Sequence, residues 1–270
     1  MSQSTESKNK ALVLGASDTL FNKRDYAAPE RFWSNDMSVL VKVVGVYHSG
    51  YGHTVKIAEA VARGAAAIYG ASVELVPADE APSRWDILDG ADAIIMGAPT
   101  YMGSLSAQFK AFMDATSNLQ YAEKRWEGKV AAGFTNGASR GGDKQTSLIQ
   151  LMTFAAQHQM HWVNLGLNYG NNRSYTNEDI LNRDSYTLGM AGQADMDLGG
   201  DIAPPYSDIR TAEFLGRRVA EVAQELAAGR AALGRPANRG VSGGADNQDP
   251  ERRGVVIPEG ATTLIGLVTA

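Results

Sequence analysis

The chain has 270 residues, 44% hydrophobic and 20% charged, which is enough for one large domain or two small ones with a sizeable core. The formal net charge is −5 and the Lys and Arg residues are scattered, so the composition argues against a nucleic-acid-binding protein. The sequence lacks cysteine, which excludes disulfides and thiol catalysis, and no two of its four histidines stand four residues apart, so we expect no metal site.

The two ends of the chain differ in composition from its middle. Residues 1–36 show no sustained periodicity and residues 232–270 include the stretch PANRGVSGGADNQDPERRG, so we expect both segments to be poorly ordered tails. Neither end carries an apolar segment long enough for a membrane span or a secretion signal, and we therefore expect a cytoplasmic protein. Residues 37–231 are predicted to form the folded domain.

Short apolar segments alternate with amphipathic ones along that domain. The Val-rich segment 39–47 is typical of a strand buried on both faces, and segment 54–69 repeats apolar residues at helical spacing. This alternation predicts an α/β fold, a doubly wound, five-stranded parallel sheet with helices on both faces. The other predicted strands are 72–76, 91–97, 130–135 and 160–165, and the other predicted helices are 105–116, 144–157 and 211–228.

Glycines and hydroxyl side chains follow the first predicted strand. A helix N-terminus presents unpaired N–H groups and the positive end of its dipole, so a phosphate can bind there without a lysine. We expect His53 to contribute its backbone amide, with its ring at the surface. A tight turn with a Ser or Thr cap is an equally supported interpretation of this loop alone. The loop consists of Ser49, Gly50, Tyr51, Gly52, His53 and Thr54.

A second polar loop follows the third predicted strand, at the same sheet edge, where ligands bind in such folds. Here a planar ring can rest, with backbone amides at its polar edge and a tyrosine as a stacking face. An ordinary loop with a surface tyrosine is the other interpretation. The residues are Pro99, Thr100, Tyr101, Met102 and Gly103.

A third loop, residues 134–146, follows the fourth predicted strand and carries three glycines. Its backbone can therefore approach a ligand closely. We expect its two long cationic side chains, Arg140 and Lys144, to be solvated.

A long segment without predicted structure, residues 168–207, separates the fifth predicted strand from the last helix. Loops longer than about 15 residues are usually functional or disordered. Its Tyr186, Leu188, Met190 and Ala191 are apolar, so we expect this excursion to pack over a site or against a neighbouring subunit.

Several motifs, each weak alone, occur in order after the expected strands. Together they resemble the WrbA-type NAD(P)H:quinone oxidoreductases of the flavodoxin-like family, over about residues 39–228. The motifs are S-x-Y-G-H at 49–53, G-x-P-T-x-x-G at 97–103, S-x-Q-x-x-x-F-x-D at 106–114, G-G-x-x-Q-T at 141–146 and H-x-M at 158–160.

The resemblance implies an FMN-dependent enzyme that passes hydride from NADH or NADPH through the flavin to a quinone, a two-electron reduction, in a homotetramer or dimer. It implies that His158 faces the flavin ring as the catalytic residue. The cofactor-binding residues that it implies are Ser49, Gly50, Tyr51, Gly52, His53 and Thr54 at the phosphate, Pro99, Thr100, Tyr101, Met102 and Gly103 along the isoalloxazine, and Thr135, Asn136, Gly137 and Gly141 over the ring and ribityl chain.

Two other functions stay open. A flavodoxin-type one-electron carrier would be a monomer with a strongly acidic face around the flavin, and the long excursion and the moderate net charge speak against it. A scaffold that has lost its cofactor is the second alternative, and the intact first loop speaks against that.

Overall fold

The structure is a computed structural model in which residues 39–235 are described. The chain divides into two units, residues 1–39 and 40–270, and the fold described below belongs to the second. The tail predicted at 1–36 lies outside the described residues, and so do residues 236–270 of the second predicted tail.

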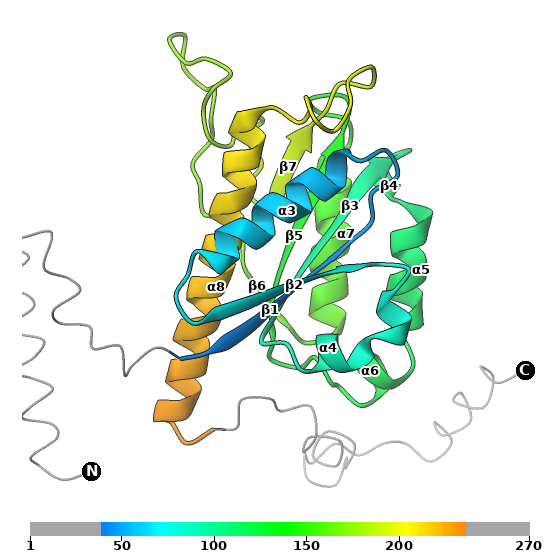
Figure 1. The fold of residues 1–270 in the computed structure, drawn as a ribbon, viewed down its shortest axis with the longest axis vertical. Helices are drawn as coiled ribbons and strands as arrows, with labels where there is room; N and C mark the ends of the chain where they lie inside the picture. Colours follow the sequence, from blue (N-terminus) through cyan, green and yellow to red (C-terminus); the bar gives the residue numbers. More distant parts are fainter. Residues whose placement is uncertain (1–38, 236–270) are drawn as a thin grey trace, which may run out of the picture. The chain divides into compact units, whose positions relative to one another are not determined.

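A parallel sheet forms the centre of the domain (Figure 1). Every pairing along its main path is parallel, as the alternation of strands and helices predicts. The Val-rich first strand lies inside the sheet, and all four of its residues from 43 to 46 are buried. In spatial order the strands are β2 (Ala71–Pro77), β1 (Val41–Tyr47), β3 (Ala93–Tyr101), β5 (Val130–Gly137) and β6 (His161–Trp162).

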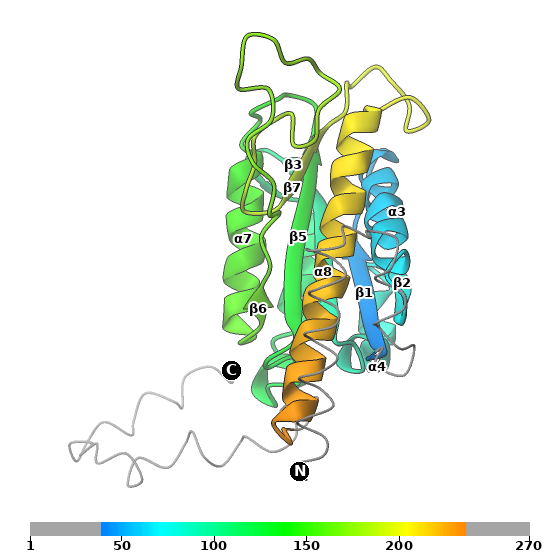
Figure 2. The ribbon, with the colours of Figure 1, turned by 90° about the vertical axis from the view of Figure 1, so that its left-hand side faces the viewer.

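Helices cover both faces of the sheet, which confirms the predicted doubly wound α/β class (Figure 2). One face is covered by α3 (His53–Ala66) and α8 (Tyr206–Ala232). The other packs a cluster of apolar side chains against η3 (Ala81–Ser83), α4 (Trp85–Asp89), α5 (Ala107–Ala115) and α7 (Lys144–Gln157), and α6 (Leu119–Ala122) follows α5. None of the helices between residues 39 and 235 has the length and apolar character needed to cross a membrane.

The helices α3 and α8 touch backbone to backbone. A Cβ atom added at Gly64 would lie 1.9 Å from the carbonyl oxygen of Glu213, and one added at Gly216 would lie 1.9 Å from that of Val61. Neither contact leaves room for a side chain, so this crossing requires glycine on both helices.

Two short strands, rather than the single predicted strand 160–165, pair with the outer edge of β5. The excursion, expected at residues 168–207, therefore begins earlier and is interrupted by the second of these strands. The chain leaves the sheet after β6, where the N–H of Val163 donates to the carbonyl of Ala131 at 2.7 Å, and returns as β7 (Met190–Gln193). β7 pairs in parallel with the later part of β5, residues Phe134 to Gly137. Met190 and Ala191, expected to pack over a site or against a neighbouring subunit, are therefore buried in the sheet, because the outer edge of β5 at residues 134–137 needs hydrogen-bonding partners.

The second predicted loop is a β-hairpin rather than an open rim. β3 continues to Tyr101 and pairs antiparallel with β4 (Ser104–Leu105). The two residues between them have positive φ, 49° at Met102 and 78° at Gly103, as two-residue hairpin turns of the favoured hand require. The predicted ring-binding segment is therefore held rigidly at the end of a buried strand.

Candidate functional site

The three predicted loops meet around one cavity of about 720 Å³ at the carboxyl edge of the sheet, a size usual for small-molecule and cofactor sites. The position agrees with the rule that ligands of open α/β sheets bind beyond the carboxyl ends of the strands. Nine of its lining residues belong to the predicted cofactor site. The cavity is lined by Tyr51, His53, Thr54, Pro99, Thr100, Tyr101, Met102, Asn136, Gly137, Ala138, Ala194, Met196 and Leu198.

The first loop passes directly into α3. Gly52 is the N-cap, with a φ of 84° that favours glycine. Since glycine has no side chain, the N-cap residue itself cannot cap the helix. The Ser49 hydroxyl instead accepts a hydrogen bond from the N–H of Val55 at 3.1 Å, so Ser49 serves the first turn from outside the helix. The first turn contains no acidic residue, so the positive end of the α3 dipole remains available to an anion at the cavity.

The ring of His53 is not a free surface group, which corrects the expectation for this residue. It is half-buried, and its Nε2 donates to the carbonyl oxygen of Leu198 at 2.7 Å. Close to it, a Cβ atom on Gly200 would come within 2.6 Å of the carbonyl oxygen of Gly52. The end of the excursion is thus packed directly onto the first loop, at residues 52 and 53.

Two tyrosines form the rim between the first loop and the hairpin. The rings of Tyr51 and Tyr101 meet edge to face, with centroids 6.2 Å apart and an interplanar angle of 71°. The Tyr101 hydroxyl lies over Gly50, where an added Cβ would be only 2.5 Å from it. Burial, and to a lesser extent Tyr51, raises the pKa of Tyr101, so its hydroxyl stays protonated near neutral pH.

Beneath the cavity, a chain of hydroxyl groups joins β3, β5 and α7. The Thr135 hydroxyl donates to the carbonyl of Ala98 at 2.7 Å, so its only proton is used. The Thr100 hydroxyl must then donate to Thr135, at 2.8 Å, and the Ser147 hydroxyl must donate to Thr100, at 2.7 Å. Thr135 is completely buried and supports Thr100 rather than lining the cavity itself.

Asn136 lines the cavity and carries an unsatisfied polar atom. The side chain is 5% exposed, and its Oδ1 has no hydrogen-bond partner among the described residues. A buried acceptor without a partner is costly, so it indicates a donor supplied by a ligand. The polar edge of an isoalloxazine carries such an N–H group, and the α3 N-terminus suits a phosphate. The residues present therefore fit FMN.

Part of the cavity wall was not predicted from the sequence. Ala138 extends the third loop, and Ala194, Met196 and Leu198 come from the end of the excursion. These last three alternate with polar residues in Gln-Ala-Asp-Met-Asp-Leu, residues 193–198, which is the pattern of a segment with one apolar face. That alternation was the available signal.

Some predicted cofactor residues stand beside the cavity without lining it. Ser49, Gly50 and Gly52 belong to the loop that lines it, and Gly103 completes the hairpin turn. The carbonyl of Gly141 accepts a hydrogen bond from the Tyr186 hydroxyl at 2.7 Å, which ties the third loop to the excursion.

The prediction that His158 faces the flavin finds no support in the single chain, where His158 lies away from the cavity. α7 begins near the cavity at Lys144 and runs back along the sheet, so its C-terminal residue, His158, lies roughly 20 Å away at the opposite edge. There it is 4% exposed, and its ring centroid is 4.7 Å from those of both Trp126 and Phe154. Burial lowers its pKa from 6.5 to about 4, so this histidine is a neutral core residue.

The sequence and the fold both have counterparts among known proteins. A family profile described as "NADPH-dependent FMN reductase" matches residues 76–171. "Flavodoxin FldP" of Pseudomonas aeruginosa is 44% identical over 186 residues, which cover 68% of this chain and 98% of that protein. An "NAD(P)H dehydrogenase (quinone)" of Aromatoleum aromaticum is 35% identical over 214 residues, 71% of this chain and all of that protein. The crystal structure of a flavodoxin, WrbA-like protein from Agrobacterium tumefaciens is 40% identical, with a TM-score of 0.52 over 68% of this chain and 98% of that one.

The strand order β2-β1-β3-β5-β6, with a cofactor-sized cavity at the carboxyl edge of the sheet, is that of a flavodoxin-like protein. Within that class, the chain belongs to the WrbA-type NAD(P)H:quinone oxidoreductases. Family membership confirms the predictions of an enzyme, of FMN as the cofactor and of NADH or NADPH as co-substrate.

Proposed function

We propose that this chain is a two-electron quinone reductase: hydride leaves NADH or NADPH and a quinone receives the electron pair at the same site. When bound, FMN supplies this redox chemistry, and the protein supplies binding, orientation and electrostatics. The observation that carries the proposal is the cavity that is lined together by the α3 N-terminus, the hairpin and Asn136, whose Oδ1 is unsatisfied.

The chain's own groups divide the work by their geometry. The backbone amides at the start of α3, around Gly52 and His53, hold the phosphate through the helix dipole. The hairpin at Pro99 to Met102 and the amide of Asn136 orient the ring. The chain of hydroxyl groups beneath the cavity keeps the Thr100 side chain in one orientation. Cofactor binding therefore costs less side-chain entropy at this residue.

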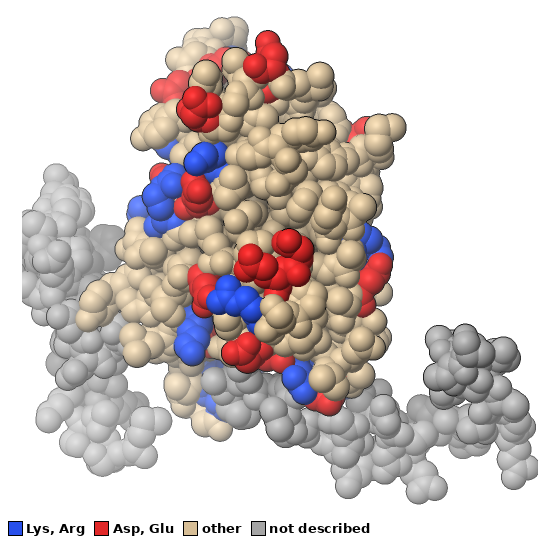
Figure 3. Space-filling model, turned by 45° about the vertical axis from the view of Figure 1, so that its right-hand side comes forward, with Lys and Arg blue, Asp and Glu red and all other residues tan. Residues whose placement is uncertain are grey.

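We also propose a homo-oligomer, a tetramer or a dimer, that covers the mouth of the cavity. Three large apolar side chains there are strongly exposed: Tyr51 at 80%, Met102 at 102% and Met196 at 86%. Figure 3 shows one face of the molecule, on which a broad area right of centre in the upper half carries almost no charged side chains. Exposed apolar surface of this kind marks interaction sites, and a neighbouring subunit would exclude water from the bound ring.

A one-electron carrier is the second candidate, and it is favoured by the name flavodoxin of the relative from Pseudomonas aeruginosa. The two functions differ in what accumulates on reduction. A carrier stabilises the one-electron reduced form, whereas a quinone reductase exchanges electrons in pairs.

One experiment separates the candidates. The protein is purified with added FMN, and oxidation of NADH and NADPH is followed with and without benzoquinone. Turnover that requires benzoquinone supports the proposal. Bound FMN without turnover rejects the quinone reductase, and accumulation of the one-electron form on photoreduction then assigns the carrier. Gel filtration of the same sample tests the oligomer, which a monomeric elution volume would rule out.

A further inference from the structure

A network of buried charges lies behind the wall of the cavity that the excursion supplies. We call Lys144, Arg183, Asp184 and Asp208 the ion network; their side chains are between 0% and 5% exposed. Charges are this deeply buried only where partners compensate the loss of water. The four residues come from α7, the excursion and the first turn of α8, so the network joins three parts of the chain.

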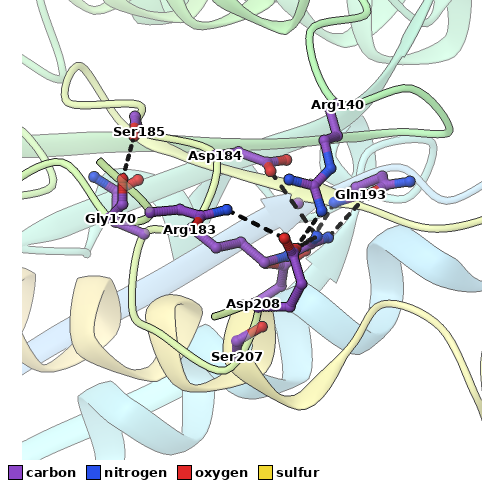
Figure 4. Close-up of polar contacts among 12 residues, drawn as sticks. Arg140, Gly170, Arg183, Asp184, Ser185, Gln193, Ser207 and Asp208 are labelled. Atoms are coloured by element: carbon purple, nitrogen blue, oxygen red, sulfur yellow. Dashed lines mark hydrogen bonds and ion pairs between the residues drawn. The ribbon is translucent and has the colours of Figure 1, made fainter. Parts of the chain in front are cut away.

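Arg183 stands at the centre of the ion network (Figure 4). Its Nε and Nη2 donate to the two carboxylate oxygens of Asp208 at 2.8 and 3.1 Å, a bidentate pair. Nη2 also donates to Gln193 Oε1 at 3.1 Å, and Nη1 donates to Glu178 at 3.0 Å. Burial lowers the pKa of Arg183, but Asp208, Asp184 and Glu178 together outweigh burial and the pKa is raised, so the guanidinium stays charged.

The ion network grips a single peptide unit at the end of β7. Lys144 Nζ donates to the carbonyl of Gly192 at 2.9 Å and to Asp184 at 3.1 Å. On the other side, the N–H of Gln193 donates to Asp208 Oδ2 at 2.8 Å. The carbonyl and the N–H of one trans peptide point in opposite directions, so the peptide between residues 192 and 193 is held from α7 and from α8 at once.

The next residue, Ala194, begins the cavity wall. Its N–H donates to the carbonyl of Gly137 at 3.1 Å, and Ala194, Met196 and Leu198 then line the cavity. At the far end of the wall, His53 holds the carbonyl of Leu198. The wall therefore has two anchors, and the one at residues 192–193 consists of buried ions.

We propose that the ion network positions this wall for cofactor binding and that Arg183 is its central positioning residue. This inference rests on the proposed cofactor cavity. Arg183 itself touches neither the cavity nor its contents; it acts through Asp208 and Gln193. Nonpolar residues of similar volume could fill the same space, but they could not hold both ends of a peptide dipole.

The test compares Arg183→Lys and Arg183→Met with wild type. Arg183→Lys keeps the charge but loses the planar fork, so it is the milder change and the one that preserves the fold. The matched control is Arg63→Met, because Arg63 also pairs with a carboxylate of α8, Glu213, at 3.1 Å but at the surface.

Two measurements are made on each protein. Hydrogen–deuterium exchange without FMN reports the protection of residues 192–198 against that of β1, and flavin fluorescence quenching reports the FMN dissociation constant. We expect exchange at 192–198 to become faster while β1 stays protected. We expect FMN affinity to fall about tenfold in Arg183→Lys and more in Arg183→Met, the scale seen when a supporting shell is lost. Arg63→Met should change neither.

Unchanged exchange at residues 192–198 in a folded Arg183→Lys protein would overturn the positioning role. The same holds if exchange rises equally over the whole sheet, because that result describes a general loss of stability. If wild type itself does not bind FMN, the proposed function fails, and the exchange pattern still decides whether the ion network holds the wall.

Discussion

His158 provides a direct test of how the interior of this domain responds to acid. The Thr116 hydroxyl donates to the carbonyl of Met113 at 2.7 Å, so the 2.9 Å contact between Thr116 and His158 must be donated by Nε2–H of the imidazole. Nδ1 therefore carries no proton, and it has no hydrogen-bond partner among the described residues. A proton added at Nδ1 would place a charge between the rings of Trp126 and Phe154.

The size of the effect follows from the pKa of His158. Burial lowers it from 6.5 to about 4, so between these pH values the unfolded chain binds a proton at this residue and the folded chain does not. Stability that is fully present above pH 6.5 is therefore lost as the pH falls. The loss is about 1.4 kcal/mol per pH unit, or about 3 kcal/mol over the whole window.

The assay is urea unfolding between pH 7.5 and about pH 4.5 of wild type, His158→Gln and His161→Gln. Glutamine keeps an N–H donor near Nε2 but does not titrate, and exposed His161 is the matched control. The free energy of unfolding of wild type should fall more steeply with acid than that of His158→Gln, whereas His161→Gln should follow wild type. Only the slopes are compared, since lost ring contacts shift the variant equally at every pH. Parallel lines for wild type and His158→Gln would refute this account of the buried imidazole.

Three further predictions concern packing and the cavity. Gly216→Ala should lower the free energy of unfolding in urea by about 1–3 kcal/mol or more, because its Cβ would meet the α3 backbone. The control Gly229→Ala, whose Cβ would meet nothing within 4 Å, should raise that free energy by about 0.5–1 kcal/mol, and equal effects of the two substitutions would contradict the close crossing. Asn136→Leu should weaken FMN binding about tenfold in a fluorescence titration. The cofactor-free protein should be as stable as wild type or more stable, because an unsatisfied buried acceptor is removed. Unchanged FMN affinity would show that Oδ1 makes no contact with the ligand. Thr135→Val, nearly equal in volume, should cost about 1–2 kcal/mol in urea unfolding, because the Ala98 carbonyl loses its donor; no change would exclude the hydroxyl chain as a stabilising element.

Much of this architecture is readable from local patterns. The predicted helix 144–157 has the observed bounds of α7, because a glycine-rich loop precedes it and its apolar residues keep helical spacing. The three loops could be placed at one edge because parallel strands all end on the same side of a sheet. Nine of the lining residues follow from that placement and the motifs.

The failures have a common physical cause, which is that long-range contacts decided the outcome. β7 has only four residues, and its strand conformation is set by β5 rather than by its own sequence. Lys144, expected to be solvated, is completely buried because its partners Asp184 and Gly192 stand 40 and 48 positions away in the sequence. The position of His158 at the far edge could have been foreseen, since a helix that starts at the carboxyl edge of the sheet returns the chain to the opposite edge.

Because the outer strand is divided into β6 and β7, the segment between them can change in length and sequence without altering the rest of the sheet. Residues 164–189 leave and rejoin the sheet beside positions 131 and 134 of β5, roughly 10 Å apart. Lengthening a loop whose ends are already fixed adds little entropic cost, because that cost grows only logarithmically with length. Insertions there would alter the surroundings of the cavity mouth while the interior keeps its packing. Relatives that share this core can therefore differ in the ligands that enter the cavity.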